Sequence, residues 1–371
     1  MRFPEFKEVW KDSNIGRCFD LYSGNTPSRM EKEHFIGDVN WITSGELKEH
    51  YIGDTKERIS EKAAADNNLR ILPIGTFVMA IYGLEAEGVR GTCSITVKTS
   101  TISQACMAFT PKSNVSNEFL YSWYKKHGNK IGIRYAQGTK QQNLSYDIIE
   151  KFPIIYPSIE EQEKLNTFIS LLDERIATQN KIIEQLQSLI KGIYDKTFAN
   201  FSKYQTLSAI CKIQKGQQIN GEELSEFGEY YVMNGGIEPS GYYDKYNTMP
   251  NTISISEGGN SCGYIQFNTV PFWSGGHCYT LQGISTEYNT HFVYHYLKSK
   301  EKEIMSLRIG SGLPNIQKKD LEIFPIPELS LETQIRISNG INKIETKLKQ
   351  EKNMLSAYQT QKAYLLRNLF I

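Results

Sequence analysis

Residues 143–162 read NLSYDIIEKFPIIYPSIEEQ, and residues 315–334 read NIQKKDLEIFPIPELSLETQ. The two stretches share an Asn followed by an aliphatic residue, then Phe-Pro-Ile, then Glu-x-Gln, and each shared residue recurs 172 positions later. Solenoid repeats have a period of roughly 20–50 residues, far shorter than this one. The sequence therefore predicts two similar domains, each followed by its own long helix.

A helical pattern follows each copy. Its apolar residues are spaced alternately four and three positions apart, as in a coiled-coil seam. Gln179 interrupts the first pattern and Glu351 the second, again 172 positions apart. We expect the two helices to pack on each other in antiparallel orientation, although each helix packing on its own domain is an alternative. The predicted seam consists of Leu165, Ile169, Leu172, Ile176, Gln179, Ile183, Leu186, Ile337, Ile341, Ile344, Leu348, Glu351, Leu355 and Tyr358.

The regions outside the helices are predicted to be rich in strands. Short β-type runs such as residues 75–82 alternate with turns rich in Gly, Asn and Ser. The starts of the two regions match at an offset of 192 and their ends at 172, so the first contains 20 more residues. We predict an α+β fold with two mixed, β-rich domains joined by a pair of long antiparallel helices forming a coiled coil. The predicted boundaries are 1–157 for the first domain, 158–200 for its helix, 201–329 for the second domain and 330–371 for its helix.

The composition is that of an ordinary globular protein. Of 371 residues 39% are hydrophobic, the net charge is +1, and no apolar run is long enough to span a membrane. The first ten residues lack the apolar core of a signal peptide. Six cysteines without a CxxC pair indicate reduced, mostly buried thiols and a cytoplasmic location. With so little net charge, any field that attracts DNA must be local or supplied by a partner protein.

The chain resembles the specificity subunit of a type I restriction–modification system. The resemblance is carried by the two copies of the opening stretch, by the paired helices, and by residues 234–242 (NGGIEPSGY) and 273–278 (WSGGHC). It implies a non-catalytic protein whose two target-recognition domains each read one half of a bipartite, asymmetric site in double-stranded DNA. It also implies that the helices set the gap between the half-sites and dock two methyltransferase subunits. Translocase–endonuclease subunits would join them, and S-adenosylmethionine, ATP and magnesium would belong to these partners.

Candidate DNA contacts follow from residue chemistry. Base edges are read by amides and other hydrogen-bonding side chains, while cations bind phosphates or guanine. The richest stretches are 134–143 and 308–318, for which a solvated turn is the alternative. The glycine-containing segments at 234–236 and 274–277 permit close approach of a ligand, or form tight turns between strands. The predicted DNA-binding residues are Ser44, Lys48, Arg134, Tyr135, Lys140, Gln141, Gln142, Asn234, Gly236, Ser274, His277, Arg308, Gln317 and Lys318.

Other functions have weaker sequence support. Asp38 with Glu46-x-Lys48 faintly resembles a metal-dependent nuclease core, and a coiled-coil scaffold without DNA specificity is a further alternative. His291 and His295 have the spacing of metal ligands on a helix, but their aromatic neighbours favour a buried helix. Neither the methyltransferase tetrapeptide (Asn or Asp, Pro, Pro, Tyr or Phe) nor a GxxxxGK[ST] phosphate loop occurs. We therefore assign no catalytic residue and no metal site to this chain.

Overall fold

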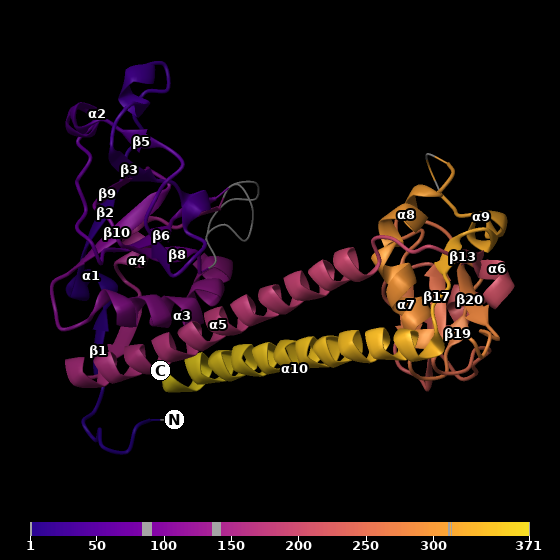
Figure 1. The fold of residues 1–371 in the computed structure, drawn as a ribbon. Coiled ribbons are helices and arrows are strands. Elements are labelled where there is room, and N and C mark those ends of the chain that lie inside the picture. Colours follow the sequence, from indigo (N-terminus) through magenta and orange to yellow (C-terminus); the bar gives the residue numbers. More distant parts are fainter. Residues whose placement is uncertain (1, 84–90, 136–141, 311, 313, 371) are drawn as a thin grey trace. The chain divides into compact units, whose positions relative to one another are not determined.

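A computed structural model describes residues 2–83, 91–135, 142–310, 312 and 314–370. It divides into two compact units, one made of residues 1–178 and 355–371, the other of residues 179–354. Each unit contains one globular domain and one half of each long helix, so the units differ from the four predicted segments. In Figure 1 the first unit begins in indigo and the second is mainly orange.

The first domain is built on a five-stranded sheet in the order β2-β10-β6-β8-β4. Its central strand, β6, is buried along its whole length, and Phe77 makes edge-to-face contacts with Phe109 and Tyr124. Helix α3 packs on β6, β8 and β10 (Figure 1). These elements span β2 Phe19–Ser23, β4 Tyr51–Ile52, β6 Phe77–Ala80, β8 Cys93–Thr96, β10 Cys106–Pro111 and α3 Asn117–Tyr135.

A second sheet of the first domain has the order β5-β3-β9, with β3 and β9 parallel. Its small core forms around Trp41, which packs against Phe35. The strands are β3 Val39–Ile42, β5 Arg58–Ile59 and β9 Ser100–Ile102. The remaining elements are β1 Lys11–Asn14, α1 Ile15–Cys18, η1 Lys32–Phe35, η2 Ser44–Glu46, α2 Glu61–Asp66, β7 Tyr82–Gly83, β11 Gln142–Asn143, α4 Tyr146–Ile149 and β12 Pro153–Tyr156.

The second domain repeats this plan. A four-stranded sheet has the order β14-β20-β17-β18, a smaller one the order β16-β15-β19, and β15 and β19 are parallel. Helix α7 packs on β17 and β18 (Figure 1). The elements are β13 Tyr204–Thr206, α6 Leu207–Ile210, β14 Lys212–Lys215, η3 Gly221–Glu223, β15 Tyr230–Met233, β16 Tyr242–Tyr243, β17 Thr252–Ser256, β18 Ile265–Asn268, β19 Trp273–Ser274, β20 Cys278–Gln282, α7 Thr290–Ser299, α8 Glu301–Ser306, α9 Lys318–Glu322 and β21 Pro325–Pro327.

Strand registers match residue for residue between the domains. Cys106 pairs with Ala80 in the first sheet, and Cys278 pairs with Ser256 in the second. The two cysteines are 172 positions apart. The duplication seen in the sequence is therefore a duplication of backbone hydrogen bonding.

The Glu-x-Gln motif owes its recurrence to a buried glutamine. The Gln162 side chain accepts a hydrogen bond from the backbone N of Ser116 at 2.9 Å and donates to the carbonyls of Asn114 and Pro157. Gln334 does the same with the N of Asn289 and the carbonyls of Glu287 and Leu329. Both glutamines are fully buried. Each one fastens the start of a long helix to the loop before α3 or α7.

The long helices are α5, Ile159–Thr197, and α10, Leu331–Leu369. In the first unit Asp173 of α5 forms an ion pair with Lys362 of α10. Two residues further along α5, the Arg175 guanidinium lies over the ring of Tyr358, which comes earlier in α10. In the second unit the Gln179 amide donates to the Glu351 carboxylate. The helices thus run antiparallel within each unit. All the predicted seam residues are buried or half-buried.

The first domain is 20 residues longer than the second, and most of this difference in length lies in the segment that connects the two sheets of each domain. Thirty-eight positions separate Ile42 at the end of β3 from Ala80 at the end of β6, whereas 23 separate the equivalent Met233 and Ser256. The longer connection carries β4, β5 and α2, and the shorter one carries β16. The six cysteines are buried and unpaired, as predicted. Among the described residues, the helices include none long and apolar enough to cross a membrane.

Candidate nucleic-acid interface

The second domain has a cavity of about 700 Å³ where three loops converge. The loop after β15 contributes Asn234 to Gly236, and the loop between β19 and β20 contributes His277. The segment after β17 contributes Glu257 to Ser261, and Asn315 pairs with Gly258 across the cavity wall. Two of the predicted DNA-binding segments, 234–236 and 274–277, therefore meet at one site.

Glycine is required where these loops touch. A Cβ on Gly275 would lie 2.6 Å from Asn234 Oδ1 and 2.9 Å from Asn234 Cβ. Gly235 has a φ of +88°, which side-chain-bearing residues rarely adopt. Asn234 Oδ1 accepts a hydrogen bond from the backbone N of His277 at 3.1 Å. The glycines thus permit tight packing that presents Asn234 and an exposed His277 at the cavity.

Ser274, one of the predicted DNA-binding residues, is buried in this structure. This residue is 2% exposed, and its backbone N donates to Asn247 Oδ1 at 2.7 Å. Its carbonyl accepts a hydrogen bond from the Gln217 backbone N. Ser274 lies in β19 and faces inward, so its role is to hold the loops together.

The first domain places its predicted segment at the equivalent position. Because β3 and β9 pair as β15 and β19 do, Ser44 and Gly45 occupy the places of Gly235 and Gly236. Ser44 is half-buried in η2, which lies against β7, and Lys48 is exposed. Strand β7 in turn pairs with β11, where Asn143 opposes Tyr82. The predicted contacts of the two domains thus occupy corresponding surfaces.

The other described candidates do not line the cavity of the second domain. At the end of α3 the Arg134 guanidinium lies 5.4 Å from the Tyr135 ring centroid, and both side chains are exposed. Arg308 and Gln317 are exposed in the second domain, and Lys318 lies 3.5 Å from Glu322. Lys140 and Gln141 lie outside the described residues. Gln142 pairs through its backbone with Gly83, and its side chain is not described.

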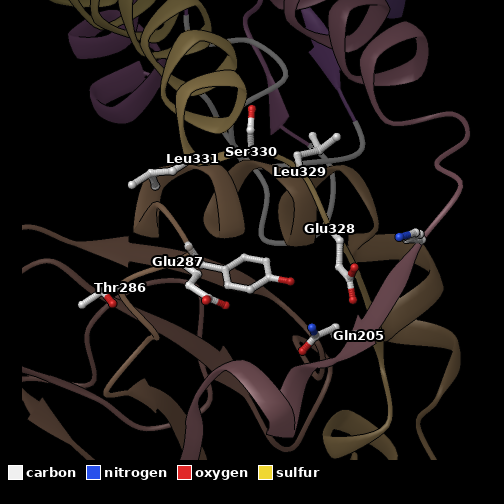
Figure 2. Close-up of a pocket in the computed structure, with 9 residues that line it drawn as sticks. Gln205, Thr286, Glu287, Glu328, Leu329, Ser330 and Leu331 are labelled. Atoms are coloured by element: carbon white, nitrogen blue, oxygen red, sulfur yellow. The ribbon is translucent and has the colours of Figure 1, made fainter.

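A second cavity, of about 540 Å³, lies where α10 begins (Figure 2). Figure 2 shows Gln205, Glu287 and Glu328 below the Leu329–Leu331 segment. Two carboxylates against the single cation of Lys203 give this cavity an acidic lining. Such a lining repels phosphate, so we do not assign DNA contacts to it.

Sequence reasoning missed a polar cluster in the larger cavity. The Glu257 carboxylate accepts hydrogen bonds from Lys215 Nζ at 2.6 Å and from Tyr279 Oη at 2.9 Å, and burial raises the pKa of Tyr279. Its other oxygen lies 3.5 Å from His277 Nδ1. A signal was available, since aligning the duplicated strands puts a carboxylate at Glu257 opposite an aliphatic residue in the first domain.

The residues of the nuclease and metal-site alternatives have structural roles. Glu46, proposed as part of a nuclease core, accepts hydrogen bonds from Thr43 and from the backbone N of Lys56 and so closes a helical turn. His295 is fully buried, and its ring nitrogens lie within hydrogen-bonding distance of Tyr194 and Asn342. The buried-helix interpretation is thus confirmed for His295. Among the described residues, groups of three or more potential metal ligands from His, Cys, Asp and Glu are absent.

Comparison with known proteins agrees with this geometry. A family model described as the type I restriction modification DNA specificity domain matches residues 7–188 and 202–356. The MjaIX specificity subunit of Methanocaldococcus jannaschii is 24% identical over 366 residues, covering 86% of this chain and 82% of that protein. A putative type I specificity subunit of Mycoplasma pneumoniae is 35% identical over 154 residues, covering 41% of this chain and 40% of that protein.

Solved structures share the fold. A type I restriction–modification S subunit from M. genitalium aligns with a TM-score of 0.70 at 21% identity, over 100% of this chain and 99% of that one. A chain from a study of assembly and conformational transition of the type I system aligns with a TM-score of 0.61 at 14% identity, over 98% and 97%. An α+β fold with two DNA-specificity domains defines this class of protein. The chain belongs to the type I restriction–modification DNA specificity family.

Proposed function

We propose that the chain is the non-catalytic DNA specificity subunit of a type I restriction–modification complex, in which each domain reads one half of a bipartite, asymmetric site. The observation that carries this proposal is the contrast between framework and surface. The backbone pairing of the two domains is duplicated, while the side chains at the corresponding loops differ. Two similar domains with different surfaces suit a DNA sequence whose two halves differ.

The contacts we assign to DNA are the predicted DNA-binding residues other than the buried Ser274. Cations bind phosphates without regard to sequence, and amides and the imidazole read base edges. In the first domain they are Ser44, Lys48, Arg134 and Tyr135, together with Lys140, Gln141 and Gln142. In the second domain they are Asn234, Gly236, His277, Arg308, Gln317 and Lys318.

The α5–α10 pair is the proposed spacer and docking element. Its narrow apolar stripe, with the polar pair of Gln179 and Glu351, supports a coiled coil that fixes the distance between the two reading surfaces. Two methyltransferase subunits dock on it, and translocase–endonuclease subunits complete the restriction enzyme. S-adenosylmethionine, ATP and magnesium are assigned to those partners, and a cytoplasmic location stays a prediction from the sequence.

The proposal is tested by co-expressing the chain with its cognate methyltransferase and mapping methylated adenines across the genome. A bipartite motif with a fixed gap is expected. An unchanged methylome would remove the proposal and favour a scaffold without DNA specificity. Metal-dependent cleavage of DNA by the purified chain alone would instead favour a nuclease, and the loss of that cleavage in Glu46→Ala would locate its site.

The spacer role has its own test. Inserting seven residues next to Gln179 and seven next to Glu351 keeps the apolar stripe in phase and lengthens each helix by about 10.5 Å. At about 3.4 Å for each base pair, the gap should grow by roughly three base pairs. Both half-sites should stay unchanged, and altered half-sites with an unchanged gap would contradict the spacer role.

A further inference from the structure

Glu257 occupies a particular place in the second domain. It follows the last residue of the central strand β17, and it lines the larger cavity. Its backbone N donates to the His277 carbonyl at 2.9 Å, and its carbonyl accepts from the Ile316 N at 2.9 Å. The backbone of Glu257 is therefore fixed on both sides, and its side chain has a defined direction.

The Glu257 carboxylate has one satisfied oxygen and one unsatisfied oxygen. Oε1 is bonded by Lys215 and Tyr279, whereas Oε2 has no hydrogen-bond partner among the described residues. The residue is 8% exposed, so its carboxylate is largely shielded from bulk water. A buried polar atom without a partner costs about 1–3 kcal/mol, and such atoms are exceptional in native structures.

The fold does not require a carboxylate at this position. In the first domain Ile81 makes the same two backbone hydrogen bonds, donating to the Ala105 carbonyl and accepting from the Leu144 N. Thus Glu257 and His277 replace an Ile and an Ala on an otherwise matched backbone. The same replacement extends to the sheet, where Lys215 opposite Tyr279 takes the place of Ser23 opposite Met107. An aliphatic side chain serves the framework there, so the polar cluster is specific to the second domain.

The chemistry of the cluster favours one kind of ligand group. An ionised carboxylate only accepts hydrogen bonds, so Oε2 requires a donor. Cytosine N4 and adenine N6 present donors in the major groove, whereas guanine O6 and thymine O4 present acceptors. Exposed His277 lies 3.5 Å from Oε2 at the cavity rim and would be displaced or turned by an entering base edge.

We propose that Glu257 is a specificity-determining residue of the second domain, and that its Oε2 accepts a hydrogen bond from the exocyclic amino group of a cytosine or adenine. This proposal rests on the function proposed above. The carboxylate selects an amino-bearing base at one position of one half-site. The first domain, with Ile81 there, makes no such selection at its own corresponding position.

The test compares methylation motifs of the assembled complex carrying wild-type chain, Glu257→Gln or Glu287→Gln. An amide both donates and accepts, so Glu257→Gln should lower the discrimination between amino-bearing and carbonyl-bearing bases about tenfold at one position. The other half-site and the gap should stay the same. Glu287→Gln makes the same chemical change within the second unit, in the acidic cavity to which we assign no DNA contact, and it should leave the motif intact.

The outcomes distinguish a failure of the role of Glu257 from a failure of the proposed DNA specificity function. An unchanged motif with a folded Glu257→Gln chain overturns the role of Glu257 and leaves the specificity function standing. Absence of any bipartite motif for the wild-type chain overturns the function itself. If Glu257→Gln does not fold, Glu257→Asp keeps the charge on a shorter side chain and must weaken the same preference without reversing it. An unaltered preference in Glu257→Asp would then overturn the proposal.

Discussion

The two domains of this chain share a framework and differ in their reading surfaces. The shared part includes the buried glutamines, the registers of the main sheets and the parallel pair of the smaller sheets. The differing part includes the connection between the sheets and the residues at the loop cavity. Where backbone hydrogen bonds set the geometry, the copies have remained alike. Where side chains face a ligand, they have diverged, and the predictions below test that division.

The largest effect is expected from the buried glutamines. Gln162→Ala removes three hydrogen bonds that a buried side chain makes to the backbone, and Gln334→Ala removes the equivalent three. Each change should lower the free energy of unfolding of its own unit by about 4 kcal/mol. Calorimetry with hydrogen exchange at the starts of α3 and α7 measures this loss. Gln187→Ala, on the exposed face of α5, is the matched control and should have little effect.

Equal losses in the two units would sharpen the comparison, because they would show that the duplicated geometry is also a duplicated energy. If Gln334→Ala left the stability unchanged while Gln162→Ala lowered it, the two glutamines would share their hydrogen-bond geometry but not their contribution to stability.

The next prediction concerns a position at which the framework itself differs. Counted from the residues that cap α3 and α7, His295 corresponds to Ser122. Burial lowers the pKa of His295 to about 4, opposed by its hydrogen bond with Asn342 and reinforced by His291. Below pH 6.5 the unfolded chain takes up a proton on this histidine, whereas the folded chain does so only near pH 4. Stability should therefore fall as the pH falls through this window, by up to about 3 kcal/mol.

Denaturant unfolding at pH 7 and pH 4.5 measures this effect. His295→Gln should lose less stability than the wild type between the two pH values, and Ser122→Ala should match the wild-type slope. A wild-type slope in His295→Gln would show that other groups carry the acid sensitivity. Burial also raises the pKa of the nearby Glu345, because the folded state disfavours the charged carboxylate. Glu345→Gln should therefore raise the stability most at neutral pH, where this carboxylate is otherwise charged.

Much of this fold could be predicted from the sequence, because the features that repeat are also the ones with local signals. The 172-residue offset and the four-three apolar spacing point to α5, α10 and the domain borders. Paired glycines indicate the loops at 234–236 and 275–276, because such close contacts exclude a Cβ. Burial has no such signal. Ser274 looks like a surface residue beside these glycines, but its inward direction is set by the parallel pairing of β19 with β15.

The burial of Glu257 could not be predicted from the local sequence either. A single Glu between a strand and two glycines has the sequence of an exposed turn. Its burial follows from Lys215 and Tyr279, which are distant in sequence and are brought together by the pairing of β14 with β20. Only a residue-by-residue match of the two domains singles it out. The least predictable residues are therefore those that make the domains different.

A smaller effect is expected at the polar pair in the helix seam. Hydrogen bonds from Lys347 and Gln179 lower the pKa of Glu351, whose residue is 5% exposed. Replacing both Gln179 and Glu351 by Leu removes the cost of burying these polar groups and should raise stability by about 1–2 kcal/mol. Gln179→Leu alone removes one hydrogen-bond partner of the Glu351 carboxylate and should lower the stability.

Thermal unfolding gives the order of stabilities, and spin labels on α5 and α10 report the register. Greater stability with a broadened label distance would show that the pair fixes the register shared by the duplicated helices. A double variant with lower stability than the wild type would mean that the polar pair stabilises the helices outright.

The smallest effect is expected from single phosphate contacts, which belong to the reading surfaces but carry no sequence information. Arg308→Ala removes an exposed cation of the second domain, and Arg134→Ala removes one at the end of α3. In the assembled complex each should lower the slope of log Kobs against log salt by about one, and at a fixed salt concentration each should weaken binding by less than about 1 kcal/mol. Lys203→Ala, in the acidic cavity, should leave the slope unchanged. Because phosphates are alike at both half-sites, neither arginine variant should alter the methylation motif. A changed base preference in Arg308→Ala would instead place its guanidinium on a base edge, and the second domain would then read DNA over a wider surface than the Glu257 cavity.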